Sequence, residues 1–567
     1  MNHALREYLV VAGFFLALSA LYFSDTFNYW FILDDPAAMV SSLDSVADIF
    51  LVNSYSFSFY TPLLPLSFKP EVKLFGMNPF PYHIHNMVIL VLTALMVYLI
   101  IRRYTDTMSS LISSVLVLFS SPSLVCVTWI TLRQYLYAMF FALAAVYLYV
   151  KYNPDLKHKR FILFLILIFS ELSFMGKEQY TTLPFVLFIL SEGGVKQRVL
   201  KTIPFFLLLA GHFFLRWYVL GGIGGYVGAH YDHDTYLKSI FLSVLTESRV
   251  LFGFPWIIFL VLMPFIQKPK KLLTASLLWL AALLVSFAVM NVHPSGVTYR
   301  YWFMPTILFS FAIGLGAALI KNRSLKVLYL IAIAVVFLSH SFSVNKDVKI
   351  QFEKESARAK QMSAALTDKR YQESIILFPE GVSFVESFRT YYFSMAFQLI
   401  SGTKIFPTLY PLELLAFYPE ILKNYKSVYR IEDGVPVDVT GSIRNEMDAF
   451  RISLSGEKPD LKLLRGSADA EISLRCKSGR AIVACSVKRR GDKYYASKDM
   501  LPYLERVPLH LGRNIVLLPV DILSHRERDW YIGEEKMEDG ATFITGLCLK
   551  EGGTKTKLSD ILYYSAP

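Results

Sequence analysis

The sequence predicts a polytopic α-helical membrane protein with a soluble α+β domain at its C-terminal end. Hydrophobic residues make up 54% of the 567 residues, aromatic residues make up 15%, and the mean hydropathy is +0.43. A soluble protein of this size is much less apolar. Charged residues are sparse up to residue 343, roughly one in nine, and make up more than one in four after it, which is an ordinary soluble value. We therefore expect a membrane domain at residues 1–343 and a soluble domain at residues 344–567.

About eleven apolar segments in the first domain predict membrane-spanning helices. Several are shorter than the roughly 20 residues that a straight span needs. The segments are residues 8–23, 87–101, 108–125, 136–149, 161–174, 181–190, 203–220, 251–266, 272–290, 301–319 and 327–342.

Short loops rich in Lys and Arg alternate with loops that lack them. The basic loops are residues 102–103, 151–160, 196–201, 268–271 and 321–326, and the positive-inside rule places them in the cytoplasm. They hold most of the net charge of +12, so the charge reports topology and no nucleic-acid partner is expected.

The first apolar segment has no small-residue cleavage site after it, so we expect a retained span rather than a signal peptide. An odd number of spans then carries the chain out of the cytoplasm. The sequence therefore predicts a multi-pass protein of the cytoplasmic (inner) membrane, in contact with membrane lipids, whose C-terminal domain is extracytoplasmic, in the periplasm.

Two adjacent carboxylates, Asp34 and Asp35, follow the outer end of the first apolar segment and precede Pro36. The structural alternative is that one of them caps a helix with Pro36 at its first position. The pair lies in a long outer loop, where apolar residues recur at helical spacing over residues 39–50 and predict a helix along the membrane interface. We therefore expect the acidic pair on a loop that is folded onto the outer membrane face.

Further ionisable residues lie near the outer ends of the predicted spans. They are Arg133, Glu171, Lys177, Glu178, His212 and Arg216. Burying such groups is costly, so they are functional candidates by default; the alternative for each is a side chain that reaches the interface on its own. Three cations beside two carboxylates, all on the face opposite to the basic loops, suit a phosphate-bearing substrate held near a general base.

A series of motifs extends this constellation along the chain. They are LDDP at residues 33–36, FYTPL at 59–63, NPFPYHIHN at 78–86, WITLR at 129–133, GKE at 176–178 and YRY at 299–301. In this order, over roughly residues 8–320, the chain resembles the GT-C class of membrane glycosyltransferases. It is most similar to the protein O-mannosyltransferase-like branch, which includes the transmembrane transferases with tetratricopeptide repeats.

The chain also departs from the pattern of that branch. Thr61 stands where a basic residue usually follows the tyrosine, and Gln134 and Tyr135 replace the small and acidic pair that often follows the arginine. No tetratricopeptide repeat is visible after Ser343.

The resemblance implies an inverting transferase that uses a hexose or pentose linked to polyprenyl phosphate and acts at the outer face. Asp34 matches the motif carboxylate of the family, which implies a general base, and Asp35 is its acidic neighbour. The implied acceptor is a hydroxyl of a glycan, a lipid or a protein, and the sequence does not choose among them. The candidate ligands of the donor phosphate are Arg133, Lys177, Arg216 and Arg300, and the supporting residues are Tyr60, His83 and Glu178, with Glu178 orienting Lys177.

A divalent metal, Mg²⁺ or Mn²⁺, is the candidate cofactor, because a metal can offset the charge of a leaving phosphate. Asp35 and His85 are its candidate ligands. His83 and His85 stand two positions apart at the start of a span, where capping or packing is the alternative to ligation. The run AHYDHD at residues 229–234 is richer in ligand types, and its alternative is a solvated loop.

The soluble domain is expected to begin with a charged helical stalk at residues 346–367. Residues 374–379 have the pattern of a buried strand, and residues 391–400 that of a helix. Residues 471–476 and 481–487 predict two strands of a hairpin around KSGR. We find no catalytic motif in this domain, and its expected role is to hold or admit the acceptor.

Two other classes of protein fit part of the pattern. A lipid or solute transporter also has many spans, but the ionisable groups gather at one face rather than at the midplane, and no paired Gly/Pro-interrupted helices stand out in two matching halves. A membrane-anchored receptor or assembly scaffold uses its spans only as an anchor, which leaves the polar constellation without an explanation.

Overall fold

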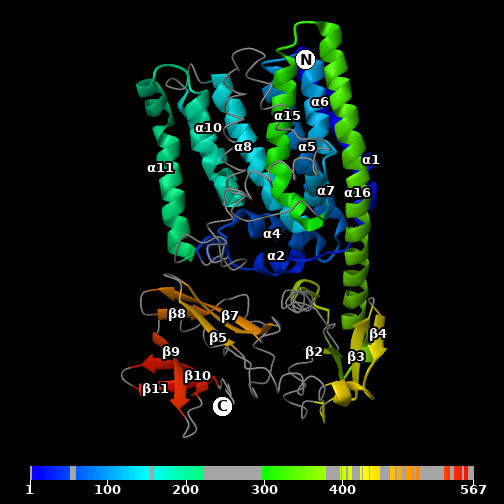
Figure 1. Cartoon of the computed structure of the whole chain (residues 1–567), viewed down its shortest axis with the longest axis vertical. Coiled ribbons are helices and arrows are strands. Elements are labelled where there is room, and N and C mark those ends of the chain that lie inside the picture. Colours follow the sequence, from blue (N-terminus) through cyan, green and yellow to red (C-terminus); the bar gives the residue numbers. More distant parts are fainter. Residues whose placement is uncertain are drawn as a thin grey trace.

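The computed structural model describes residues 3–51, 59–152, 159–220 and 296–377, and then short stretches between residues 396 and 559, from residue 447 on by their backbone alone. A helical bundle is followed by three small sheets, which lie beyond one end of the bundle (Figure 1). The helices of the bundle are α1 (His3–Phe23), α5 (Phe80–Arg102), α6 (Thr107–Leu118), α7 (Ser121–Thr128), α8 (Arg133–Tyr152), α9 (Arg160–Gly176), α10 (Leu183–Leu190), α11 (Val195–Leu220), α15 (Phe303–Ala317) and α16 (Arg323–Thr367).

Nine of the eleven expected apolar segments overlap these helices. The other two, residues 251–266 and 272–290, lie outside the described residues. Within the described residues, five helices are long and apolar enough to cross a membrane, or up to six if one bent pair counts as a single span. An integral membrane protein follows from this, while the count of about eleven spans stays a prediction.

The bent pair is α6 and α7, which the sequence suggested as one span at residues 108–125. The two helices meet at an angle of 52°. The bend occurs because Ser120 caps a new helix, with its side chain accepting a hydrogen bond from the backbone N–H of Ser123 and with Pro122 in the first turn. Proline there removes no helical hydrogen bond.

Three short helices lie across the end of the bundle that faces the sheets: α2 (Asp35–Ser41), α3 (Val46–Leu51) and α4 (Leu63–Phe75) (Figure 1). The prediction of a single interfacial helix over residues 39–50 is therefore wrong, because the chain forms two helices, α2 and α3, in this region. Ser42 Oγ donates to the carbonyl of Met39 at 2.6 Å, and Ser45 Oγ accepts from the backbone N–H of Asp48 at 3.1 Å. These side-chain bonds end one helix and start the next.

Helix α16 is 45 residues long, about 68 Å at 1.5 Å per residue. It begins at a cap, since the side chain of Asn322 accepts from the backbone N–H of Leu325 at 3.1 Å. It is continuous through the expected domain boundary at residues 343 and 344, so the last span and the expected stalk form one helix. The division of the chain at that boundary stays a prediction.

The sheets follow the stalk. In the first sheet, β1 (Ser374–Leu377) pairs in parallel with β2 (Thr408–Tyr410) and β3 (Ser427–Glu432), and β3 pairs antiparallel with β4 (Val435–Asp438). The second sheet is an antiparallel meander of β5 (Asp460–Arg465), β6 (Asp469–Arg475), β7 (Ala481–Arg490) and β8 (Lys493–Ala496). The third holds β9 (Asp529–Lys536), β10 (Thr542–Glu551) and β11 (Thr554–Ser559). Strands β1, β6 and β7 overlap the three expected strands.

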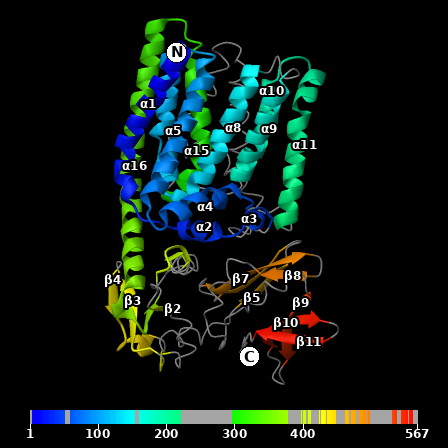
Figure 2. The same cartoon turned by 180° about the vertical axis from the view of Figure 1, so that it is seen from behind.

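One buried cluster joins the short helices α2 and α4 to the C-terminal end of α16 and to the first sheet. It contains Phe31, Ala38, Met39, Leu64, Phe68, Val72, Tyr82, Ile130, Ala365, Leu366, Ile376 and Phe397. We call it the outer cluster. Trp30 reinforces it, because its backbone N–H donates to Ser356 Oγ at 2.6 Å and its indole N–H donates to Ser363 Oγ at 3.0 Å. The acidic loop, the end of α16 and the sheets therefore occupy the same end of the bundle, as the reverse view also shows (Figure 2).

Candidate active site

The acidic pair follows a strained turn. Leu33 has a φ of +52°, a left-handed conformation that costs a residue with a side chain about 1–2 kcal/mol. Asp34 comes next at the N-cap position of α2, and Pro36 lies in the first turn. The capping alternative is therefore right about the position, but the side chain of Asp34 makes no capping hydrogen bond.

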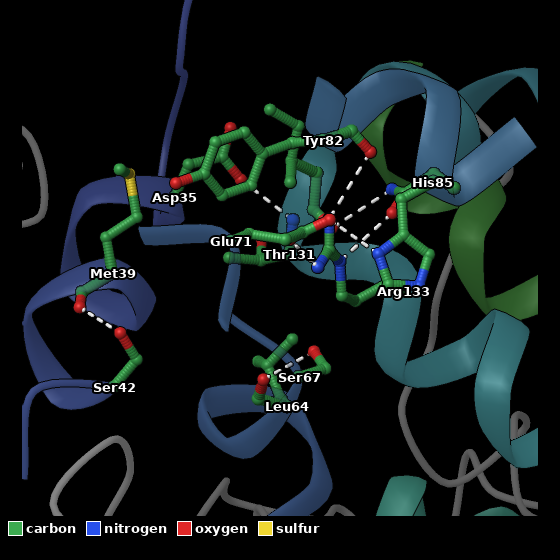
Figure 3. Close-up of polar contacts among 12 residues, drawn as sticks. Asp35, Met39, Ser42, Leu64, Ser67, Glu71, Tyr82, His85, Thr131 and Arg133 are labelled. Atoms are coloured by element: carbon green, nitrogen blue, oxygen red, sulfur yellow. Dashed lines mark hydrogen bonds and ion pairs between the residues drawn. The ribbon is translucent and has the colours of Figure 1, made fainter. Parts of the chain in front are cut away.

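The carboxylate of Asp35 is fully buried. One oxygen accepts from the backbone N–H of Ile32 at 2.9 Å, and the other accepts from the backbone N–H of Thr131 at 2.8 Å (Figure 3). Burial raises the pKa of Asp35 to about 7, although these hydrogen bonds lower it. Asp34 is partly exposed, so Asp34 is the carboxylate of the pair that a ligand can reach.

Arg133, the first residue of α8, lies against α4 and has no exposed surface. Its Nη1 pairs with Glu71 on α4, its Nε donates to Asn86 Oδ1 at 3.0 Å, and its Nη2 donates to the carbonyl of Tyr82 at 3.3 Å (Figure 3). Its guanidinium carbon also lies 4.3 Å from the ring centre of Phe68. Arg133 pairs its charge with Glu71 and ties α4 to α5 and α8, and the phosphate contact expected for it stays a prediction.

Sequence reasoning missed Glu71, although a carboxylate within the apolar run 63–75 is a visible signal. It accepts from Arg133 and also pairs with His85 Nδ1, whose other ring nitrogen lies 2.6 Å from Tyr137 Oη. Both ring nitrogens of His85 are thus engaged by side chains.

These contacts test the expected metal site. Both oxygens of Asp35 are taken by backbone donors, and both ring nitrogens of His85 by Glu71 and Tyr137. Asp35 and His85 therefore do not fit a divalent metal. Across the described residues, no group of three or more His, Cys, Asp or Glu side chains is arranged to hold a metal ion, and the run at residues 229–234 lies outside them.

His83 is fully buried at the start of α5. One ring nitrogen lies 3.2 Å from the carbonyl oxygen of Val127, and the other lies 3.0 Å from that of Tyr29. The packing alternative holds for His83, which ties α5 to the end of α7 and to the acidic loop.

Lys177, Glu178 and Arg216 form a second polar group near the C-terminal ends of α9 and α11. Glu178 lies between the two cations, with Lys177 Nζ at 3.4 Å from one carboxylate oxygen and Arg216 Nη2 at 3.4 Å from the other. Lys177 and Arg216 are 7% and 4% exposed. Lys177 also lies over the ring of Tyr135, with Nζ 5.4 Å from the ring centre.

Arg300 joins this group through aromatic rings. Its guanidinium carbon lies 4.9 Å from the ring centre of Trp129 and 4.4 Å from that of Tyr301, whose hydroxyl accepts from Nη2 at 2.9 Å. The ring centre of Tyr301 lies 6.3 Å from that of Tyr135, which is also the ring under Lys177. Three of the four expected phosphate ligands, Lys177, Arg216 and Arg300, are therefore linked by one chain of contacts, which we call the cation network.

The WITLR segment connects the acidic loop to the cation network. The backbone of Thr131 binds the carboxylate of Asp35, and the ring of Trp129 stacks under Arg300. Arg133, at the end of the segment, pairs with Glu71. The segment thus fixes the acidic pair relative to Arg300.

Tyr60 is buried beside α11. It is 1% exposed, and its hydroxyl has no hydrogen-bond partner among the described residues. Its ring centre lies 5.8 Å from that of His212, whose Nδ1 lies 2.8 Å from Glu171 Oε1. The sequence indicated Glu171 and His212 as polar residues near the outer ends of the spans but gave neither a role.

Among solved structures, the oligosaccharyltransferase of Archaeoglobus fulgidus in complex with Zn and sulfate is similar, with 10% identity, a TM-score of 0.44, and coverage of 86% of this chain and 77% of that one. The oligosaccharyltransferase AglB of Archaeoglobus fulgidus, in complex with an inhibitory peptide and a dolichol-phosphate, gives 12% identity, a TM-score of 0.38, and coverage of 75% and 69%.

No curated protein matches the sequence. Residues 61–218 match the family model described as dolichyl-phosphate-mannose-protein mannosyltransferase. The matched stretch contains three of the motifs, NPFPYHIHN, WITLR and GKE, together with Lys177 and Arg216 of the cation network. The match confirms that this chain resembles the GT-C class of membrane glycosyltransferases.

Proposed function

We propose that the protein is an inverting glycosyltransferase that moves a hexose or pentose from a polyprenyl phosphate to an acceptor hydroxyl at the extracytoplasmic face of the membrane. The observation that carries this proposal is the cation network, which the WITLR segment connects to the acidic pair. The match of residues 61–218 supports the donor class, since the description of that family, dolichyl-phosphate-mannose-protein mannosyltransferase, gives dolichyl phosphate mannose as donor and protein as acceptor. That name favours a protein over a glycan or a lipid as the acceptor here.

The reaction is a single displacement. The carboxylate of Asp34 takes the proton of the acceptor hydroxyl as the acceptor oxygen bonds to the anomeric carbon. The bond from that carbon to the phosphate oxygen breaks at the same time, and polyprenyl phosphate leaves with the electron pair. Attack opposite to the leaving group inverts the anomeric centre.

The cation network suits the leaving phosphate. Lys177 and Arg216 both lie 3.4 Å from Glu178, which is longer than the roughly 2.7–2.9 Å of a close charge-assisted hydrogen bond. Each cation has several N–H donors, so each can donate to a phosphate oxygen while it stays beside Glu178. Glu178 then orients Lys177, as the sequence suggested. Preorganised positive charge at the leaving group stabilises the transition state more than the ground state.

In this proposal Asp35 and Arg133 hold other residues in place and do not contact the substrate. Asp35 fixes the turn that presents Asp34, since its carboxylate ties residues 32 and 131 together. Arg133 holds α4 against α5 and α8 through Glu71 and Asn86. No step of the proposed reaction runs through a metal, because Asp35 and His85 are engaged elsewhere.

The proposed location is the cytoplasmic (inner) membrane, with the acidic loop and the sheets in the periplasm. The turn between α15 and α16 contains Lys321, and Arg323 and Lys326 follow in the first turn of α16. This turn lies at the opposite end of the bundle from α2 and α4 (Figure 1). The positive-inside rule then places α2, α4 and the sheets outside. At that face Asp34 meets acceptors that are already exported.

A transfer assay tests the proposed activity. Membranes with and without the protein are incubated with polyprenyl phosphate linked to radiolabelled mannose, and with glucose- and arabinose-linked donors in parallel. We expect label to move from the lipid extract into non-lipid product only when the protein is present, with free polyprenyl phosphate released in equal amount. Intact donor on the other side of the membrane, as for a transporter, or no difference between the membranes, as for a scaffold, would contradict the proposal.

A further inference from the structure

A second polar cluster lies beside the cation network and has no part in the reaction described above. It consists of Tyr60, just before α4, Glu171 on α9 and His212 on α11. The ring of Tyr60 packs against His212, and His212 Nδ1 holds Glu171 Oε1 at 2.8 Å. Arg216 of the cation network follows His212 by one helical turn, so the two groups share one face of α11.

Two polar atoms of this cluster and one of the neighbouring Arg216 are buried and lack a partner among the described residues. These atoms are Tyr60 Oη, Glu171 Oε2 and Arg216 Nε. Tyr60 is 1% exposed and Arg216 is 4% exposed. Buried polar groups in folded proteins are nearly always satisfied, so several orphans in one place need an explanation such as an absent ligand.

The orphaned atoms define the chemistry of that ligand. The carboxylate of Glu171 only accepts hydrogen bonds, Arg216 Nε only donates, and the hydroxyl of Tyr60 does both. Burial and the charge of Glu171 raise the pKa of Tyr60 well above its usual range, so its hydroxyl stays protonated and remains a donor. A ligand with several hydroxyl groups matches this mixture, because each hydroxyl both donates and accepts.

Other ligands fit less well. A second phosphate would face the unpaired oxygen of Glu171, which repels it. A metal ion would find one carboxylate and one imidazole, and the imidazole already turns Nδ1 to Glu171. The described residues hold no group of three metal-ligating side chains.

We propose that Tyr60, Glu171 and His212 form a subsite for the hydroxyl groups of the donor sugar, while Lys177 and Arg216 hold its phosphate. The inference rests on the proposed function, since it assigns the sugar and the phosphate of one donor to adjacent groups. His212 is a positioning residue in this subsite, because it fixes one oxygen of Glu171 and leaves the other for the sugar. Tyr60 and Glu171 make the hydrogen bonds.

Binding to two lipids separates this subsite from the phosphate site. The purified protein in lipid nanodiscs is titrated with polyprenyl phosphate and with polyprenyl phosphate linked to mannose. For Tyr60→Phe we expect about two- to tenfold weaker binding of the sugar-linked lipid, and for Glu171→Gln about tenfold or more, as for loss of a neutral and of a charge-assisted hydrogen bond. Both variants should bind bare polyprenyl phosphate as the wild type does. Lys177→Ala should weaken the binding of both lipids.

Tyr149→Phe is the matched control. Tyr149 is buried, its hydroxyl is hydrogen bonded to Ser191, and it lies near the end of α8 that is far from Lys177. The same chemical change there should leave the binding of both lipids unaltered, which shows that removal of a buried tyrosine hydroxyl does not by itself impair the fold.

The outcomes are distinct. If Tyr60→Phe and Glu171→Gln weaken both lipids equally or weaken neither, the subsite is overturned and the proposed function stands. If a chelator weakens the sugar-linked lipid in the wild type but not in Glu171→Gln, Glu171 holds a cation and the subsite is overturned. If the wild type binds neither lipid, the proposed function fails together with the subsite.

Discussion

The carboxylate of Asp35 accepts a hydrogen bond of 2.8 Å from the backbone N–H of Thr131, 96 positions further along the chain. This bond fastens the acidic loop to the segment that ends at Arg133. The two carboxylates also differ in their surroundings, because both oxygens of Asp35 accept backbone hydrogen bonds while Asp34 stays partly exposed.

This difference predicts that the loss of Asp35 destabilises the fold more than the loss of Asp34. Asp35→Ala leaves the buried N–H groups of Ile32 and Thr131 without acceptors, and each such group costs about 1–3 kcal/mol. Asp34→Ala removes a partly exposed side chain without a capping bond and should cost less than about 1 kcal/mol. Thermal unfolding of both variants in detergent measures the difference, and equal melting temperatures would contradict the structural role of Asp35.

The pKa of Asp35 predicts a pH dependence of stability. Its value of about 7 in the folded protein lies above the ordinary value of 3.8, so between about pH 4 and pH 7 the folded chain holds a proton that the unfolded chain has lost. Stability from this group is therefore present at low pH and falls as the pH rises to about 7, by up to about 1.4 kcal/mol per pH unit. Above about pH 7 the contribution is constant.

Asp35→Asn isolates this contribution, because every other group titrates in both proteins. We expect the melting temperature of the wild type, relative to that of Asp35→Asn, to decline between pH 5 and pH 7 and then to level off. Profiles that run parallel over this range would show that Asp35 keeps an ordinary pKa.

Arg133 and Lys177 should respond differently to the same substitution. Arg133→Ala leaves Glu71 buried without its cation, which typically costs about 3–5 kcal/mol, so it should lower the melting temperature. Lys177→Ala should keep the fold and weaken donor use about tenfold to a hundredfold, as for a lost charge-assisted contact to phosphate. Lys177→Arg should be milder than Lys177→Ala.

Both the melting temperature and the donor binding should therefore be measured for each variant. Replacing Arg133 and Glu71 together by methionine should restore stability relative to Arg133→Ala, since no buried charge is then left alone. An Arg133→Ala variant that is as stable as the wild type but has lost donor binding would return Arg133 to the phosphate site.

Local patterns predicted the parts of this fold that depend on nearby residues. Apolar runs located nine segments of the bundle, and the alternation at residues 471–487 located the paired strands β6 and β7. The bend between α6 and α7 also had a local signal. Ser120, a capping residue, stands two positions before Pro122, and this pattern is typical of the start of a helix. An apolar run alone does not reveal it, because the hydropathy continues across the bend.

The pairings within the site had no such signal. Arg133 and Glu71 are 62 positions apart, and His212 and Glu171 are 41 apart. Each residue was visible as a charge in an apolar setting, but which charges meet depends on how the helices pack. The left-handed turn at Leu33 was equally hidden, since leucine does not favour that conformation. The sequence therefore located the acidic pair and the cations but not which of them are exposed to a ligand.

Topology gives a further prediction. A peptide tag after Pro567 should be accessible to an impermeant antibody on cells whose outer membrane has been opened, and a tag at Lys270 should become accessible only after the inner membrane is opened too. The physical reason is the concentration of Lys and Arg in the loops at one end of the bundle. A C-terminal tag that is reached only from the cytoplasm would place the acidic loop and the sheets on the wrong side for an exported acceptor.

Asp34→Asn tests the central claim most directly, because it keeps the size of the side chain and removes its ability to take a proton. The loss of a general base lowers a rate by about 10²–10⁴, while the small stability cost leaves the protein in the membrane. Mass spectrometry of extracted lipids and of surface glycans should then show that cells with Asp34→Asn accumulate the polyprenyl-phosphate-linked sugar and lack the glycosylated product. Normal amounts of both, with the variant expressed at the wild-type level, would contradict the assignment of Asp34 as the catalytic base.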